Sequence, residues 1–207
     1  MSTDRRVLRS REALLSAAVR LVAARGTTAI PVTDFAAAAG VSRQLVYLQF
    51  GDRDALLVAA AADLVTRDLL QDTYGDIRLG VLATVQHFAR HRAFYRPMLT
   101  GSCSYGMTRT MNGVFGPLNQ RVLRERFGDL DEDLAADLGK VAAAGAGAII
   151  NDWLVDSPDP LDPQEAADRL LRLASVFPGG PDEADQPPFP ADAAPAATAD
   201  EGHPGQA

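Results

Sequence analysis

The stretch from Pro31 to Phe50 constrains the fold more than any other part of the chain, because it predicts two short helices joined by a tight turn. Val32 to Ala39 is alanine-rich and helical, and Gly40 supplies the positive φ that such a turn needs. Ser42 is placed to cap a second helix that runs to about Phe50. The spacing of the apolar residues predicts a small core between the helices, made of Phe35, Ala36, Ala39, Val41 and Val46.

Helical patterns continue on both sides of this pair. The preceding helix has an apolar face made of Leu14, Ala18, Leu21 and Val22. It ends near Gly26, which suits a left-handed C-terminal cap, and Pro31 opens the next segment with a φ that already suits a helix. Asp52 is placed to cap a fourth helix, whose predicted buried stripe is Leu57, Ala60, Ala61 and Leu64.

The remaining pattern is also helical, so we predict an all-α fold. A helix is expected from Asp76 to about Arg92, with inward-facing residues Ile77, Val81, Val85 and Phe88. Four glycines loosen the stretch between Pro97 and Pro117, at positions Gly101, Gly106, Gly113 and Gly116. Further helices are expected over 118–127, from Asp131 to before Pro158, and from Pro163 to Phe177. Asp162 and Glu165 provide the start signal of the last one.

Residues 178–207 differ in kind from the rest. They hold seven prolines and six acidic residues with no lysine or arginine, which predicts a disordered tail. The predicted organisation is a three-helix helix-turn-helix domain over residues 1–53, a larger helical ligand-binding and dimerisation domain over 54–177, and the tail.

Composition argues for a soluble cytoplasmic protein. No apolar run approaches the ~20 residues that cross a bilayer, so we expect no membrane association. The early arginines are followed by no apolar signal core, and the single cysteine, Cys103, excludes an intramolecular disulfide framework.

Charge is distributed unevenly along the chain. The net charge is −7, but residues 1–53 hold eight arginines against four acidic residues and carry +4, which leaves −11 on the remainder. A basic head on an acidic body is typical of a protein that touches phosphates with one end. From spacing alone the two short helices could still be an ordinary helical hairpin. The polar start of the second one nevertheless suits a major groove, because arginine pairs with guanine and glutamine with adenine.

The chain also resembles a known family. Ala-Gly-Val-Ser at 39–42, Leu-Val-Tyr-Leu-Gln-Phe at 45–50 and Asp-Arg-Asp-Ala-Leu at 52–56 resemble the helix-turn-helix signature of the tetracycline-repressor (TetR) family of transcriptional regulators. The preceding helix, residues 14–26, is similar too, so the resemblance covers about Leu8 to Leu57. It implies a regulator of transcription, most simply a ligand-responsive homodimeric repressor on a palindromic operator in double-stranded DNA.

The resemblance also implies which residues meet DNA. Ser42, Arg43, Gln44 and Leu45 would form the base-facing start of the recognition helix. Tyr47, Gln49 and Arg53 would contact the DNA backbone. Three departures from the family pattern alter the expected operator: Pro31 and Val32 replace hydroxyl residues, which leaves Thr33 as the substitute; Gln49 replaces an aromatic residue or histidine; and Leu45 replaces a small or polar residue.

The family resemblance further implies dimerisation through the last two long helices. The residues expected at that interface are Ala142, Ala146, Ile149, Trp153, Ala166, Leu170, Leu173 and Phe177. The alternative is that these side chains belong to the core of one protomer.

An unidentified small-molecule effector is expected in the larger domain. Candidate ligand-binding residues mix apolar bulk with a few polar groups: His87, Tyr95, Cys103, Tyr105, Met107, Met111, Phe115 and Asn119. Ordinary core packing is the alternative for each of them.

We expect no catalytic residues, no cofactor and no metal site. His87 and His91 have a spacing that can place both imidazoles on a metal, with Cys103 as a third ligand, but no fourth ligand is evident. No nucleophile motif surrounds Cys103, which argues against an enzyme. The alternative function is a small-molecule- or metal-binding helical protein whose DNA binding has lapsed.

Overall fold

The computed structural model describes residues 2–70, 76–128 and 130–176, and within these ranges it confirms the all-α prediction. The described residues form nine helices: α1 (Ser2–Arg25), α2 (Val32–Ala38), α3 (Arg43–Phe50), α4 (Arg53–Leu69), α5 (Ile77–Arg90), α6 (Arg92–Thr100), α7 (Ser104–Phe127), α8 (Glu132–Asp156) and α9 (Pro163–Val176). The predicted tail and Phe177 lie outside the described residues.

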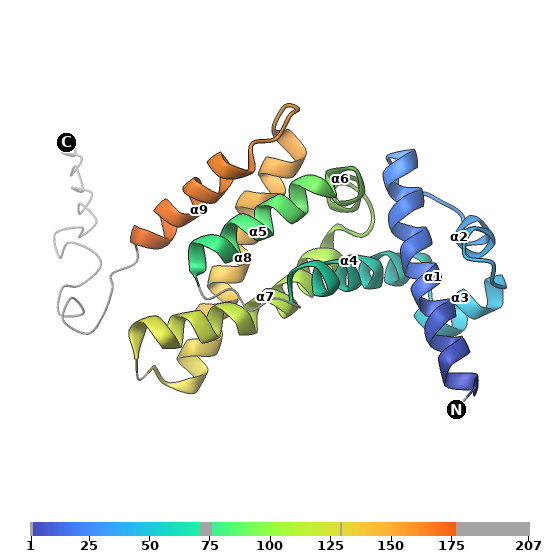
Figure 1. The fold of residues 1–207 in the computed structure, drawn as a ribbon, viewed down its shortest axis with the longest axis horizontal. Helices are drawn as coiled ribbons and strands as arrows, with labels where there is room; N and C mark the ends of the chain where they lie inside the picture. The colour runs from blue at the N-terminus through green and yellow to red at the C-terminus, as the bar shows by residue number, and fades with distance from the viewer. Residues whose placement is uncertain (1, 71–75, 129, 177–207) are drawn as a thin grey trace, which may run out of the picture.

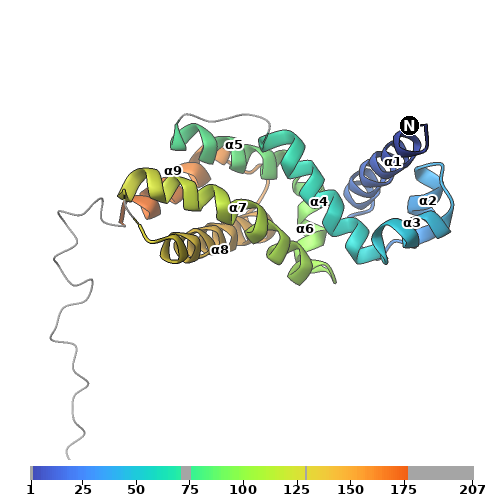
Figure 2. The same cartoon turned by 90° about the horizontal axis from the view of Figure 1, so that it is seen from below.

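The helices are arranged as an N-terminal three-helix unit and a larger helical body (Figure 1). Helices α1, α2 and α3 lie together at one end of the elongated molecule, and α5 to α9 form the other end. Helix α4 runs between the two and packs against α1, α3, α5 and α7 (Figures 1 and 2). Helix α4 therefore connects the N-terminal unit directly to the body.

Local signals at the N-terminal unit act as predicted. Gly26 and Gly40 adopt φ of +63° and +64°, a region that side-chain-bearing residues rarely enter. The side chain of Ser42 accepts a hydrogen bond from the backbone N–H of Leu45, and that of Asp52 accepts one from Ala55. The start of α2 also agrees with the prediction. Pro31 is the extended N-cap of α2, with ψ of 142°, and the helix begins at Val32.

The core runs continuously from the N-terminal unit into the body. Helix α4 supplies its centre, because Leu57, Ala60, Ala61 and Leu64 are all buried as predicted. Phe35 and Val46 are fully buried beneath the helix pair. The predicted inward stripe of α5 was wrong at Ile77, which is 47% exposed because it is the first residue of the helix; Val85 and Phe88 are buried.

The predicted loosening between Pro97 and Pro117 is confined to the residues around Gly101. Helix α7 is continuous from Ser104 to Phe127 and contains Gly106, Gly113, Gly116 and Pro117. Packing explains why it persists: a Cβ placed on Gly139 of α8 would lie 2.6 Å from the carbonyl oxygen of Gly116, so the two backbones are in contact. Tertiary contact with α8 therefore offsets the weak intrinsic helix propensity of this stretch.

The C-terminal helices begin as the capping residues predict. The carboxylate of Asp131 accepts hydrogen bonds from two backbone N–H groups at the start of α8, and that of Asp162 does the same for α9. Among the described residues, no helix is long and apolar enough to cross a membrane.

Candidate DNA-binding surface and ligand domain

The recognition helix α3 presents its polar start to solvent. Ser42, Arg43, Gln44 and Tyr47 are exposed, while Val46 points into the core and fixes the rotation of the helix. Leu45 is half-buried, so only part of its side chain reaches the surface. Ser42 stabilises the first turn through its cap, which holds Arg43 and Gln44 at the free N-terminal end. That end is the part of such a helix that enters a major groove.

Arg43 is held against Tyr47 on the outer face of α3. Its guanidinium donates a hydrogen bond to the Tyr47 hydroxyl over 3.1 Å, and its central carbon lies 5.2 Å from the ring centroid. Both side chains are exposed, so the contact is screened by solvent and weak. The Arg43 guanidinium can therefore leave Tyr47 for a partner that binds it more strongly, either a charged group or a group that accepts two hydrogen bonds.

The other predicted DNA contacts differ in how they lie. Thr33 is exposed on α2 and its hydroxyl donates to the carboxylate of Asp34 over 3.3 Å. Both polar atoms of the Gln49 amide are buried, and they have no hydrogen-bond partner among the residues that the structure describes. Gln49 therefore does not present its amide to solvent in this conformation.

Arg53, at the start of α4, has partners within the chain. Its guanidinium donates to the Asp54 carboxylate over 2.7 Å and to the Ser102 hydroxyl over 3.1 Å. Burial acts to raise the pKa of Asp54, but the hydrogen bonds from Arg53 and Ser102 outweigh it and lower that pKa. The start of α4 is thereby tied to the loop between α6 and α7, which sequence reasoning did not foresee.

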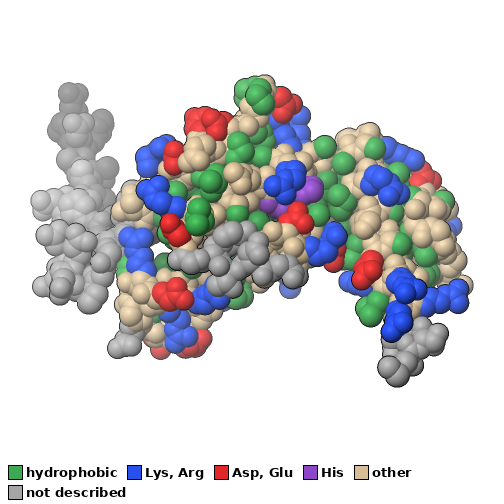
Figure 3. All heavy atoms as spheres, in the orientation of Figure 1, with side chains coloured by type: hydrophobic (Ala, Val, Ile, Leu, Met, Phe, Trp, Pro, Cys, Tyr) green, Lys and Arg blue, Asp and Glu red, His purple; other side chains and the backbone are tan. Residues whose placement is uncertain are grey.

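Arginines at the start of α1 extend the basic surface. Arg5, Arg6 and Arg9 are exposed, and Arg11 lies over the Phe50 ring at 4.6 Å, which places this end of α1 beside the end of α3. Basic side chains accordingly gather near the N-terminus in Figure 3. These arginines contribute to the +4 charge of residues 1–53, but the family resemblance did not place them among the site residues. Their close spacing was the available signal.

Most of the predicted ligand-binding residues lie in one buried region of the body. His87, Tyr95, Cys103, Met107 and Met111 are buried in the same core, with Phe115 half-buried 6.4 Å from the Phe88 ring. Tyr105 points away from it and is 78% exposed, and Asn119 is half-buried farther along α7. The region is packed.

Two hollows are formed elsewhere in the body. One of about 230 Å³ is lined by Arg78, Asp168, Leu171, Arg172 and Ser175. A smaller one of about 20 Å³ lies between α8 and α9, against Trp153 and Leu170. The predicted ligand-binding residues line neither of them.

Cys103 is separated from the histidines with which the sequence pattern grouped it. Burial raises the pKa of its thiol to about 11, with a further contribution from the nearby Asp54 carboxylate. The thiol is thus protonated and inert at neutral pH, and it lies with Ser102 and Asp54 at the start of α4.

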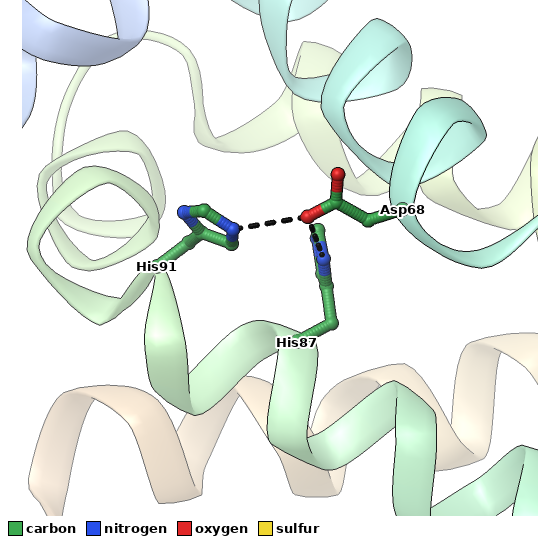
Figure 4. A group of neighbouring side chains, drawn as sticks. All are labelled: Asp68, His87 and His91. Carbon is green, nitrogen blue, oxygen red and sulfur yellow. Dashed lines mark hydrogen bonds and ion pairs between the residues drawn. The ribbon is translucent and has the colours of Figure 1, made fainter.

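The two histidines are instead joined by an aspartate from another helix. Asp68, near the end of α4, places Oδ2 3.1 Å from Nδ1 of His87 and 3.1 Å from Nε2 of His91 (Figure 4). Nε2 of His87 lies 2.8 Å from the Tyr95 hydroxyl. Burial lowers the pKa of His87 to about 4, assisted by His91 and opposed by Asp68, so His87 is neutral at pH 7.

The predicted dimer residues lie on α8 and α9 and are only partly covered within one chain. Ala142, Ala146, Ile149, Trp153, Ala166 and Leu170 are half-buried, and Leu173 is exposed. Trp153, Ala166 and Leu170 also pack against the core of the protomer. Two exposed residues of α8, Leu134 and Val141, were absent from the prediction although they are large and apolar.

Comparison with known proteins agrees with the helical architecture. Residues 14–60 match the family described as bacterial regulatory proteins, tetR family. This match spans α1 from Leu14, the helix pair and the first half of α4. No curated protein matches the sequence.

Solved structures with the same fold cover most of the chain. The TetR family repressor AlkX from Dietzia sp. strain DQ12-45-1b, implicated in biodegradation of n-alkanes, is 22% identical, with 80% of this chain and 94% of that chain covered at a TM-score of 0.54. The dihydroxyacetone kinase operon activator DhaS is 13% identical, with coverage of 81% and 94% and a TM-score of 0.60. Thermus thermophilus FadR, a TetR family repressor in complex with lauroyl-CoA, is 22% identical, with coverage of 79% and 92% and a TM-score of 0.54.

Proposed function

We propose that this chain is a transcriptional regulator of the TetR family, whose family model matches residues 14–60, and that it acts as a ligand-responsive homodimeric repressor on a palindromic operator. The observation that carries the proposal is the free, capped N-terminal end of α3, where Arg43 and Gln44 are exposed on a helix held by Val46. A helix end of this kind suits the major groove, and a two-fold dimer presents two of them to two half-sites.

The exposed side chains divide into base and backbone contacts. We assign Arg43 and Gln44 to base edges, with Leu45 against a thymine methyl group. Ser42, Thr33, Tyr47 and the arginines of α1 are assigned to phosphates. Gln49 and Arg53 stay in the proposed set on the condition that binding frees them from their present surroundings, since the Gln49 amide is buried and Arg53 is bonded to Asp54 and Ser102.

The dimer is proposed to form through α8 and α9. The half-covered residues predicted on these helices, with Leu134 and Val141 beside them, provide apolar surface that one protomer leaves open to solvent. Two-fold symmetry would bring the same surface of each protomer together, as in most homodimers.

Effector binding is proposed in the region lined by His87, Tyr95, Met107, Met111 and Phe115. We propose residues 1–53 as the DNA-binding domain and 54–177 as the effector and dimerisation domain, with α4 as the connection between them. Its 17 residues span roughly 25 Å. A ligand that favours one position of α4 would change the separation of the two recognition helices, and it changes DNA affinity only by its preference between the two positions.

A second link between the domains supports this coupling. Gly101, at the end of α6, lies so close to Thr28 of the α1–α2 loop that an added Cβ would be 2.5 Å from the threonine hydroxyl. The neighbouring Ser102 bonds Arg53 at the start of α4. The α6–α7 loop therefore touches the N-terminal unit at two points, and movement of the body would be felt at both.

The test is selection of bound sequences from a random pool of double-stranded DNA, followed by affinity measurements on the selected operator. A two-fold-symmetric site with a defined half-site spacing is expected. Arg43→Ala should cost about 1–3 kcal/mol on the selected site and relax preference at one position per half-site. Arg121→Ala, on the exposed surface of α7, is the matched control and should leave affinity unchanged.

Three outcomes would count against the proposal or one of its parts. An equal loss of affinity on every sequence would make Arg43 a phosphate contact. Selection of an asymmetric site would argue against the palindrome. No salt-dependent binding to random DNA at low salt would favour the alternative, a ligand-binding protein with lapsed DNA binding.

A further inference from the structure

We propose that Asp68, His87 and His91 form a binding site for a first-row divalent transition-metal ion of the zinc type. Asp68 comes from α4, His87 from α5, and His91 is the residue that joins α5 to α6 (Figure 4). The histidines are four residues apart, and the backbone N–H of His91 donates to the carbonyl oxygen of His87 over 3.1 Å, so the two residues lie one helical turn apart. Asp68 faces them from across the α4–α5 contact.

The distances suit one shared ion. The three ligand atoms, Oδ2 of Asp68, Nδ1 of His87 and Nε2 of His91, lie within 4.8 Å of one another. Ligands about 2.0–2.1 Å from a tetrahedral zinc ion are separated by roughly 3.3 Å. The carboxylate oxygen already lies 3.1 Å from each nitrogen, so it needs almost no movement. The two nitrogens would approach each other through rotation of the His91 ring, which is partly exposed.

The contact of His87 with Tyr95 orients the ring for a metal. When Nδ1 binds an ion, Nε2 carries the proton, and this N–H donates a hydrogen bond to the Tyr95 hydroxyl oxygen, 2.8 Å away. Metal-binding histidines usually make a hydrogen bond of this kind through their other nitrogen, because it fixes the tautomer and the ring. His87 is 1% exposed, so its ring is also held by packing.

The site is open on one side. The side chains of His91 and Asp68 are 24% and 28% exposed, and histidine atoms are visible on the molecular surface in Figure 3. Three protein ligands with solvent access leave a further position for water or for a donor atom of an effector. Two imidazoles and a single carboxylate favour zinc-type ions over Ca²⁺ and Mg²⁺, which prefer sites made of oxygen.

The position of the site predicts a consequence for regulation, which rests on the proposed function. Asp68 lies next to the last residue of α4, the helix whose other end begins beside the recognition helix. An ion would join α4 to α5 more rigidly than hydrogen bonds do. Metal binding should therefore favour one position of α4 and change the affinity for DNA.

Direct binding measurements on the full chain, free of any polyhistidine tag and treated with a chelator, test the site. Titration with Co²⁺, followed by visible absorption, and with Zn²⁺, followed by calorimetry, should show one ion per chain. Asp68→Asn and His91→Ala should each weaken binding by at least about 100-fold, and Tyr95→Phe by about 10–100-fold. His203→Ala removes the remaining histidine of the sequence and should bind as the parent does.

The controls separate a metal site from a hydrogen-bonded triad. Circular dichroism establishes that each variant is folded, and Asp68→Asn serves as the mild variant because it keeps the size of the side chain. Absence of Co²⁺ binding, or parent-like affinity in both Asp68→Asn and His91→Ala, would overturn the site and leave three side chains joined by hydrogen bonds. Operator affinity is then compared with and without Zn²⁺. Binding of the ion with unchanged DNA affinity would overturn the regulatory consequence but not the site, and neither result depends on which operator is selected.

Discussion

Gly139 offers a sharp test of the packing that holds the body together. It lies where α8 crosses α7, and a Cβ added to it would lie 2.6 Å from the Gly116 carbonyl oxygen and 2.9 Å from the backbone nitrogen of Gln120. Both atoms belong to the backbone, so no side-chain rotation can relieve the contact. Gly139→Ala must therefore push the two helices apart.

The expected magnitude follows from two opposing effects. Overpacking a close contact costs about 1–3 kcal/mol, and the upper end applies here because backbone atoms are met. Alanine is about 0.8–1.0 kcal/mol better than glycine in a helix, which offsets part of the cost. The free energy of unfolding should fall by about 2 kcal/mol. For a protein of this size, that corresponds to a Tm lower by roughly 4–8 °C.

Gly113→Ala is the matched control. Gly113 is exposed within α7, and a Cβ there would meet nothing within 4 Å, so only the helix propensity changes. Its Tm should rise by roughly 2–4 °C. Both variants are melted by far-ultraviolet circular dichroism at several protein concentrations, because dimerisation would make Tm concentration-dependent. A Gly139→Ala variant that melts at or above the parent temperature would refute the contact.

Three further predictions concern the link between the two ends of the molecule. Leu64→Ala should destabilise the fold by about 2–5 kcal/mol and, at matched folded fraction, reduce the ratio of DNA affinities measured with and without effector; an unchanged ratio would contradict the role of α4. Burial raises the pKa of the Cys103 thiol to about 11, so only ~0.1% of it is thiolate at pH 8. A thiol reagent should therefore modify Cys103 at least 100-fold more slowly in the native protein than in the urea-unfolded protein. Equal rates would show that the thiol is accessible. Gly101→Ala should cost about 1–3 kcal/mol in urea unfolding, and Thr28→Ala should partly rescue it; simple additivity in the double mutant would argue that the two residues do not touch.

The N-terminal unit could be predicted from the sequence because its signals are local. Gly40 turns the chain, Ser42 caps α3 and Asp52 caps α4, and each acts on backbone groups within three residues of itself. Hydrogen bonding and φ preferences of this range do not depend on the rest of the fold. The exposed start of the recognition helix followed from the same signals, since Val46 faces the core.

The arrangement of the body depended on contacts that no local pattern contains. Asp68 is 19 residues from His87, and Arg53 is 49 from Ser102, so only the crossing of helices brings these pairs together. The glycines of α7 were expected to weaken a helix, yet α7 is continuous and packs closely on α8, because Gly139 of α8 has no Cβ to meet the Gly116 carbonyl oxygen. The helical period of the sequence indicates which residues share a face of a helix. The packing of whole helices decides which face contacts which neighbouring helix and at what distance. For this reason the sequence pointed to the DNA-binding end, while the grouping of Asp68 with the two histidines came only from the tertiary structure.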